Sequence, residues 1–146
     1  YAGNPLACAA GLAVIEEIEA GGLMANAGRV GAVLKARLEG LMQRHAFIGD
    51  VRGKGLLLAF ELVADRQTRR PLPKALNAHV ELVERAYEEG LIIYSRRSRD
   101  GIEGDHFLVC PPMITTEAEV EEIVARLTAA LARFAAQAAP ALAESA

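Results

Sequence analysis

Hydrophobic residues are concentrated between positions 48 and 63, in two apolar runs joined by the short link Arg52-Gly53-Lys54-Gly55. The second run, residues 56–63, is almost continuous and contains a single charge, Glu61. A short unbroken apolar run is typical of a strand that is buried on both faces. Gly53 and Gly55 supply backbone freedom, so a hairpin or a bulge fits between the runs. The pattern predicts that this hairpin forms the centre of a small sheet covered by helices.

A first helix is predicted before the hairpin. Asn4 can cap the free amides at its start, Pro5 suits the first helical position, and Gly21-Gly22 ends it. Residues 6–18 are almost all apolar and include many small side chains, which indicates a helix that is closely surrounded. A 146-residue chain is too small to cover such a helix, so we expect a partner surface from another domain or a second subunit.

Three further helices are predicted from apolar residues that recur at spacings of three and four. The fourth helix begins at a capping box formed by Thr116 and Glu119. The expected inner faces are Leu23, Ala27, Val30, Leu34, Leu38 and Leu41 in the second helix, Leu76, Val80, Val83 and Tyr87 in the third, which stops at Gly90, and Val120, Ile123, Val124, Leu127, Leu131 and Phe134 in the fourth.

Two more strands are predicted at residues 91–94 and 107–110, joined by a basic, glycine-containing loop and able to pair antiparallel. The resulting order is helix, helix, strand, strand, helix, strand, strand, helix. This order is typical of an α+β fold with a small, largely antiparallel sheet covered by helices. We expect three parts: an interdomain or dimer-interface helix at residues 1–20, a small domain at 21–137, and a frayed Ala-rich tail at 138–146.

Composition restricts the classes of partner. The chain is 52% hydrophobic and 24% charged, with a net charge of −3, so no attraction to nucleic acid is expected. No apolar run is long enough to cross a bilayer, and no signal peptide is visible, so we expect a cytoplasmic protein without a membrane partner. Cys8 and Cys110 lie in apolar segments and are predicted to be buried free thiols. Because the chain opens on Tyr1, directly before a helix, we expect a piece of a longer protein.

Common catalytic and ligand-binding motifs are missing. The glycine-rich link lacks the spacing and the Ser or Thr of a phosphate-binding P-loop. The three histidines and two cysteines do not have metal-ligand spacing, and no serine lies in a hydrolytic triad pattern. Arginines in the loop at residues 64–74 are either solvated or bind an anionic partner. Residue types alone therefore establish an α+β domain with an unusually hydrophobic first helix.

Four motifs that follow one another along the chain indicate a particular protein family, which the residue types alone do not. They are residues 1–11 (YAGNPLACAAG), 48–56 (IGDVRGKGL), 89–91 (EGL) and 104–117 (GDHFLVCPPMITTE). Together they resemble the C-terminal part of class III aminotransferases, which are pyridoxal-phosphate enzymes of the aspartate-aminotransferase fold (fold type I). The likeness extends over nearly the whole chain, in the right order. It implies a homodimeric transaminase that moves an amino group from an amine or amino acid to a keto acid.

The resemblance also implies that part of the machinery lies elsewhere. In the family, a lysine holds pyridoxal phosphate as a Schiff base, and the cofactor ring stabilises the carbanion. Lys35, Lys54 and Lys74 do not lie in the family's lysine motif. We therefore expect a large domain of the same enzyme as the principal partner of this chain and the main cofactor site, and we expect the isolated chain to be inactive.

The resemblance suggests only a few site residues here. Tyr1, Gly3 and Asn4 lie next to the position at which the family contacts the cofactor phosphate, although helix capping explains Asn4 equally well. No arginine is present at residues 107–110, and Glu117 stands where some relatives carry a mobile arginine. Arg96 or Arg97 can replace these anchors for a substrate carboxylate, with solvated loop arginines as the alternative. Arg52, in the glycine-rich link, is interpreted as a brace for the hairpin or a domain contact.

Two other classes of function remain open. The chain can be a non-catalytic, small-molecule-binding or regulatory α+β module that senses a small acid through its loop arginines. It can also be an assembly domain that uses its first helix. The reading frame upstream of Tyr1 distinguishes these from an enzyme, because an upstream lysine motif indicates the aminotransferase.

Overall fold

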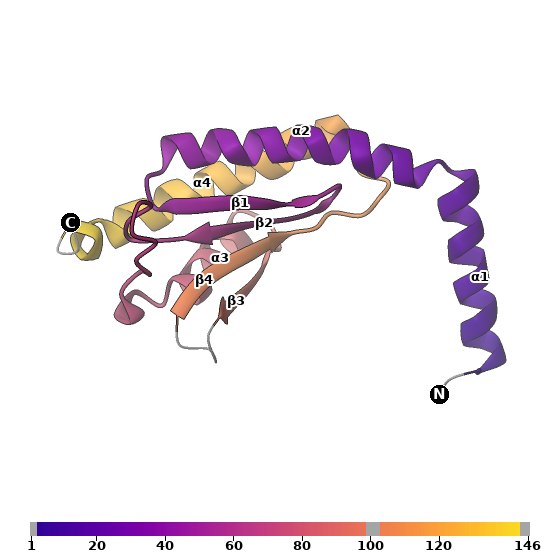
Figure 1. Cartoon of the computed structure of the whole chain (residues 1–146), viewed down its shortest axis with the longest axis horizontal. Coiled ribbons are helices and arrows are strands. Elements are labelled where there is room, and N and C mark those ends of the chain that lie inside the picture. Colours follow the sequence, from indigo (N-terminus) through magenta and orange to yellow (C-terminus); the bar gives the residue numbers. More distant parts are fainter. Residues whose placement is uncertain (1–2, 99–102, 144–146) are drawn as a thin grey trace.

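The structure, a computed structural model, describes residues 3–98 and 103–143 (Figure 1). Its elements are α1 (Pro5–Ala20), α2 (Leu23–Arg44), β1 (Ile48–Lys54), β2 (Leu57–Leu62), the 3₁₀ turn η1 (Lys74–Leu76), α3 (Ala78–Glu88), β3 (Tyr94–Ser98), β4 (Glu103–Val109) and α4 (Glu117–Ala143). The strands form one antiparallel sheet in the order β1-β2-β4-β3. The α+β class and the order of the helices and strands are confirmed.

One face of the sheet packs on helices α2, α3 and α4, and the core lies between them (Figure 1). Phe60 of β2 is paired in register with Phe107 of β4, and their rings stack with centroids 4.9 Å apart. The buried residues of α2 are Val30, Gly31, Leu34, Leu38 and Leu41, which confirms the inner part of the predicted face. No described helix packs on the opposite face of the sheet, which is called the open face below.

The central hairpin is confirmed, but β2 is not buried on both sides. Leu57 is 66% exposed and Glu61 is half-buried, because both lie on the open face. The neighbouring residues Leu58, Phe60 and Leu62 point to the helices and are each 1% exposed. The hydrophobic run thus predicted the strand correctly. The prediction that both faces of the strand are buried is wrong.

The glycine-rich turn of the hairpin lies directly against the backbone of α2. Gly53 and Gly55 have φ of 133° and 56°, values that L side chains rarely adopt. A Cβ built on Gly31 of α2 would lie 2.2 Å from the carbonyl carbon and oxygen of Gly55. The helix therefore approaches the turn closely only because a glycine stands on each side of the contact.

Two local predictions are wrong. The buried face of α3 is Ala78, Leu82 and Ala86, whereas Val80 and Tyr87 are 39% and 69% exposed. The predicted face is therefore wrong in part: Leu76 and Val83 do pack against the core, but the fully buried positions include two alanines that the apolar pattern did not single out. The strand predicted at 91–94 begins at Tyr94 instead and includes polar residues through Ser98. These polar residues are tolerated because β3 is an edge strand with one open side.

The termini also differ from expectation. Asn4 caps α1 as predicted, its Oδ1 accepting from the amides of Leu6 (3.0 Å) and Ala7 (3.2 Å). At the other end, α4 continues through Ala143, and Ala138 is fully buried, so the helix runs on past the predicted start of the tail at 138. The division into 1–20, 21–137 and 138–146 stays a prediction.

Several smaller points follow from the same structure. The thiols of Cys8 and Cys110 are free, as predicted, but both are exposed, so their predicted burial is wrong.

The capping box is confirmed, since Glu119 accepts from the amide and hydroxyl of Thr116, which lowers the pKa of the Glu119 carboxyl. Among the described helices, none combines the length and apolar character needed to span a membrane.

Candidate functional site

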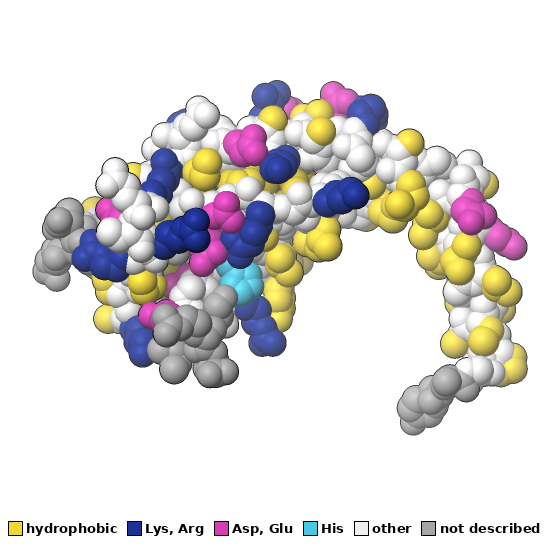
Figure 2. Space-filling view, viewed as in Figure 1, with side chains coloured by type: hydrophobic (Ala, Val, Ile, Leu, Met, Phe, Trp, Pro, Cys, Tyr) yellow, Lys and Arg dark blue, Asp and Glu magenta, His cyan; other side chains and the backbone are white. Residues whose placement is uncertain are grey.

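The open face carries two rows of side chains that cross all four strands. Residues next to Phe60 and Phe107 must point away from the helices, because successive side chains of a strand alternate between faces. Figure 2 shows charged groups over the middle of this face and hydrophobic groups toward α1. By strand register, the polar row is Asp50, Glu61, His106 and Arg96, and the adjoining row is Arg52, Ala59, Leu108 and Tyr94.

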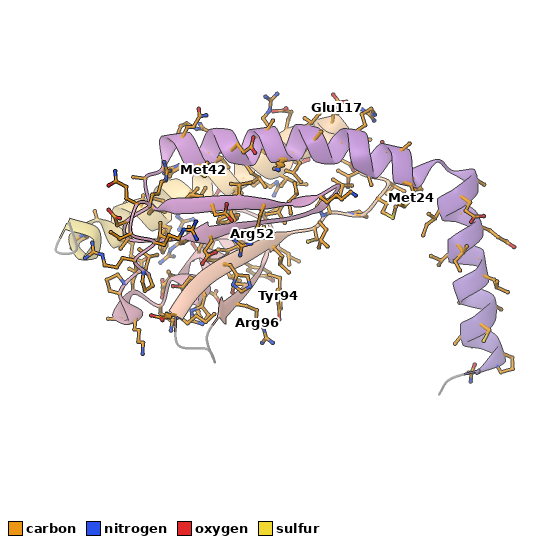
Figure 3. All side chains as sticks on the ribbon, in the orientation of Figure 1. Met24, Met42, Arg52, Tyr94, Arg96 and Glu117 are labelled. Carbon is orange, nitrogen blue, oxygen red and sulfur yellow. The ribbon has the colours of Figure 1, made fainter. Side chains whose placement is uncertain are left out.

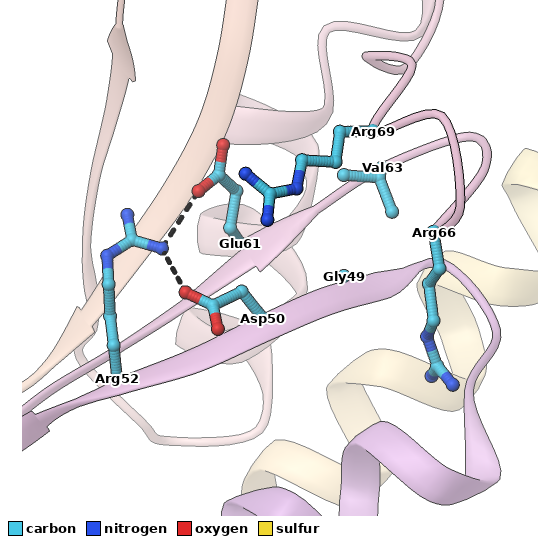
Figure 4. A pocket seen from close by; sticks show the side chains of 7 residues that line it. All are labelled: Gly49, Asp50, Arg52, Glu61, Val63, Arg66 and Arg69. Carbon is cyan, nitrogen blue, oxygen red and sulfur yellow. Dashed lines mark hydrogen bonds and ion pairs between the residues drawn. The ribbon is translucent and has the colours of Figure 1, made fainter.

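Arg52 links the first two strands across this face. Its Nη1 donates to Asp50 Oδ2 at 2.7 Å and to Glu61 Oε2 at 2.8 Å (Figure 4). The hydrogen bond to Asp50, followed by that to Glu61, raises the pKa of the Arg52 guanidinium above its ordinary value. The prediction that Arg52 braces the hairpin is confirmed, and its charge is already balanced by two carboxylates.

A hollow of about 340 Å³ lies beside this ion pair (Figure 4). Arg66 borders it but donates to the backbone oxygens of Ile48 (2.7 Å), His45 (2.6 Å) and Met42, so it closes the loop onto α2 and β1. Arg69 also borders the hollow and has a left-handed φ of 57°. With Asp50 and Glu61 in the same lining, the hollow has mixed charge and is not a simple anion site.

The two arginines proposed for a substrate carboxylate point to opposite sides of β3. Arg97 faces the helices, where its Nε donates to Asp105 Oδ1 at 2.9 Å, and Asp105 is only 2% exposed. His79 Nδ1 of α3 lies 3.2 Å from the same oxygen. Arg97 Nη2 is buried and has no hydrogen-bond partner among the residues that the structure describes. Arg97 is thus tied to a buried carboxylate, while Arg96 stays exposed on the open face (Figure 3).

Sequence reasoning missed Asp105 because the last strand was predicted to begin only at residue 107, whereas β4 begins at Glu103. The signal was present in the alternation of residues 103–109, where Asp105 shares the side of Phe107 and Val109. An acidic residue in register with an inward-facing arginine on the next strand predicts a cross-strand pair.

The segment after β4 is fastened to the start of α2. Asn26 Nδ2 donates to the backbone oxygens of Met113 (2.8 Å) and Thr115 (3.0 Å). Glu117, at the first position of α4, forms an ion pair with Arg29 (Figure 3). These contacts hold the segment between β4 and α4 against the start of α2. Glu117 is already paired with the cation of Arg29.

The candidate residues near the cofactor lie far from the arginines. Gly3 and Asn4 are at the free end of α1, which Figure 1 places well away from β3 and the sheet. Tyr1 lies outside the described residues. The structure therefore does not bring Gly3, Asn4 and Arg96 into one site within this chain.

The residues present do not make a complete pyridoxal-phosphate site. A lysine that forms a Schiff base is held in an enclosing pocket that favours its neutral form. Lys54 and Lys74 are exposed, and the side chain of Lys35 is 41% exposed with its Nζ 4.0 Å from Glu39. Likewise, the described residues contain no group of three or more side chains able to hold a metal ion.

The chain resembles known proteins in sequence and in fold. The family model of class III aminotransferases matches residues 1–131. The chain belongs to this family. It is 41% identical over 128 residues to the taurine–pyruvate aminotransferase of Rhodobacter capsulatus, covering 88% of this chain and 28% of the relative. It is also 37% identical over 130 residues to the leucine/methionine racemase of Thermococcus litoralis, covering 89% and 27%.

The fold comparison agrees with the family. An amine transaminase from an uncultivated Pseudomonas species, solved with pyridoxal phosphate bound, superposes with a TM-score of 0.77 at 40% identity. The match covers 88% of this chain and 28% of that structure. The chain thus spans little more than a quarter of the length of these aminotransferase relatives, and it shares the fold of the corresponding part.

Proposed function

We propose that these residues are the small C-terminal domain of a pyridoxal-phosphate-dependent aminotransferase. The whole enzyme moves an amino group from an amine or amino acid to a keto acid, as a cytoplasmic homodimer. The observation that carries the proposal is the family match over residues 1–131, together with relatives such as the taurine–pyruvate aminotransferase and the amine transaminase structure, of which the chain covers only about 28%. The reactive lysine and most of the cofactor site belong to the large domain in this proposal.

The positions of the three lysines support placing the Schiff-base lysine in the large domain. All three lie on the surface of elements that face solvent, and the hollow beside Arg52 contains no lysine in its lining. The chain alone has no amine in the setting that Schiff-base formation requires. We therefore expect it to fold and to remain inactive in transamination.

A cofactor-binding experiment tests this expectation. Pyridoxal phosphate added to the isolated chain is expected to give no stable absorbance band of a lysine adduct, and borohydride is expected to leave no reduced cofactor on the protein. The longer polypeptide encoded by the same reading frame should give both. A reducible adduct on the isolated chain contradicts the proposal, as does a longer polypeptide that only racemises amino acids.

Arg96 is our candidate for binding a substrate carboxylate. It is exposed on the open face beside Tyr94, whereas Arg97 is held by the buried Asp105 (Figure 3). A free guanidinium can bind a carboxylate through two parallel hydrogen bonds. Gly3 and Asn4 remain proposals for proximity to the cofactor.

The Arg96 proposal predicts a selective kinetic effect in the full-length enzyme. Arg96→Ala is expected to raise KM for substrates that carry a carboxylate by about tenfold, the loss of one charge-assisted hydrogen-bonded contact. KM for amines without a carboxylate should be unchanged, which makes these amines the internal control. Equal KM values for both substrate types in variant and parent would remove Arg96 from the site.

A further inference from the structure

The hollow beside Arg52 lies where the central hairpin departs from regular strand geometry. The pairing of β1 with β2 shifts its register between Ile48 and Asp50, at Gly49. Such a shift re-aims the neighbouring side chains and is common next to active sites. A Cβ built on Gly49 would lie 2.6 Å from a methyl carbon of Val63, so a larger residue would displace that side chain. The resulting space of about 340 Å³ is at the lower end of the range for small-molecule sites.

The loop that borders the hollow is closed by its own hydrogen bonds. Asp65 Oδ1 accepts from the amide and the hydroxyl of Thr68, at 2.6 and 2.7 Å, and these bonds lower the pKa of the Asp65 carboxyl. The amide of Ala64 donates to the backbone oxygen of Arg70 at 2.8 Å. These contacts hold Arg69 in its left-handed conformation, which costs free energy in a residue other than glycine. The loop therefore fixes the point from which the Arg69 side chain extends.

The guanidinium of Arg69 is unpaired, unlike the two other arginines of the lining. Arg52 is held by Asp50 and Glu61. Arg66 donates to backbone oxygens at the C-terminal end of α2, where the helix dipole favours a positive charge. The Arg69 side chain forms no hydrogen bond or ion pair with a described residue, and Figure 4 shows it extending from the loop toward Glu61. Its guanidinium is available to a ligand in the hollow.

The two carboxylates of the lining also retain free acceptor atoms. Arg52 donates to Asp50 Oδ2 and Glu61 Oε2, so Asp50 Oδ1 and Glu61 Oε1 accept no side-chain hydrogen bond from the described part of the chain. With Arg66 turned to α2, the two carboxylates and the two remaining arginines balance in charge. An anion bound to Arg69 would also meet the carboxylates, and a cation bound to the carboxylates would meet the arginines. A molecule with one group of each sign is complementary to both.

We propose that this hollow binds a small zwitterion of the free amino acid type. The ligand carboxylate pairs with the Arg69 guanidinium through parallel hydrogen bonds, and the ligand ammonium donates to the free oxygens of Asp50 and Glu61. A purely acidic ligand, as expected from the loop arginines in the sequence, is disfavoured because those two carboxylates repel it. The site goes beyond the proposed function, since its lining contains no lysine and none of the residues proposed for cofactor or substrate.

Isothermal titration calorimetry of the longer polypeptide of the same reading frame tests the proposal. The probes are L-proline and piperidine-4-carboxylate, zwitterions with near and distant charges that have no primary amino group to transfer. At least one of them is expected to bind at a site that Arg69→Met weakens by at least about tenfold, the loss of a charge-assisted contact. Arg70→Met is the matched control on the next residue, which lies outside the lining, and should bind as the parent does.

Singly charged analogues test whether both charges are needed. Pyrrolidine has only the cation of L-proline and cyclopentanecarboxylate only the anion, so each should bind at least about tenfold more weakly than the zwitterion. Failure of both zwitterions to bind overturns the proposal, as does equally tight binding of a singly charged analogue.

The two variants test the position of the site. Equal binding by Arg69→Met and the parent overturns the proposal, and so does equal weakening by Arg70→Met, which would assign the effect to the general charge of the loop. Calorimetry measures binding whether or not the longer polypeptide transaminates. Failure of this proposal is therefore distinguishable from failure of the proposed function.

Discussion

Gly31→Ala is expected to lower the free energy of unfolding of the domain by about 2–3 kcal/mol, the upper part of the range for overpacked sites. The added Cβ would stand 2.2 Å from the backbone of Gly55, and backbone atoms of a tight turn cannot move aside as a flexible side chain can. Either α2 or the hairpin turn must shift, and the shift disturbs the packing of Val30 and Leu34 on the sheet.

Gly28→Ala is the matched control for that experiment. Gly28 lies one turn earlier in the same helix and has nothing within 4 Å of its Cβ position. Its replacement should stabilise the domain by about 0.5–1 kcal/mol, because alanine loses less backbone entropy in a helix than glycine does. Urea unfolding followed by circular dichroism in the far ultraviolet measures both variants. Equal stability of the two variants would show that the close approach of α2 to the turn is not present.

Asp105→Leu is expected to have the second large effect and to lower the free energy of unfolding by about 3 kcal/mol. Removing one partner of a buried ion pair costs about 3–5 kcal/mol, because the other charge remains buried without compensation. The carboxylate is 2% exposed and is held by Arg97 at 2.9 Å, with His79 at 3.2 Å. The lower value is expected here because the Arg97 side chain is 14% exposed and can reach some water. Urea unfolding measures the loss.

A double variant shows whether this cost comes from the stranded charge. Arg97→Met combined with Asp105→Leu should recover most of the lost stability, since an apolar pair of similar volume replaces the ion pair. Arg96→Met is the control on the neighbouring residue, which is exposed on the open face, and should change stability by less than about 0.5 kcal/mol. A double variant as unstable as Asp105→Leu alone would contradict a buried Arg97–Asp105 pair.

Local signals in the chain predicted most of the framework. Asn4 and Pro5 start α1, Thr116 and Glu119 start α4, and glycine pairs end α1 and turn the hairpin. Each of these signals works over four or five residues, through a hydrogen bond or a dihedral preference that needs no distant partner. The class of fold and the family followed from them and from the order of the motifs.

The fully buried positions of α3, the start of β3 and the separation of Arg96 from Arg97 were not predicted. The face of α3 that packs inward is chosen by where two alanines allow close approach to α4, and the period of the apolar residues does not reveal this. Arg96 and Arg97 are adjacent and chemically identical, yet their register with His106 and Asp105 assigns one to solvent and the other to the core.

The sequence by itself determined the helix ends, the hairpin, the α+β class and membership of the aminotransferase family. Only the tertiary structure decided which side of the sheet stays open, which arginine is free, and that α1 has no cover within the described residues. The physical reason is the separation along the sequence of the groups that interact. Caps and turns depend on neighbours along the chain, whereas the burial of Asp105 and the exposure of Leu57 depend on groups that are distant in sequence and meet only in the folded sheet.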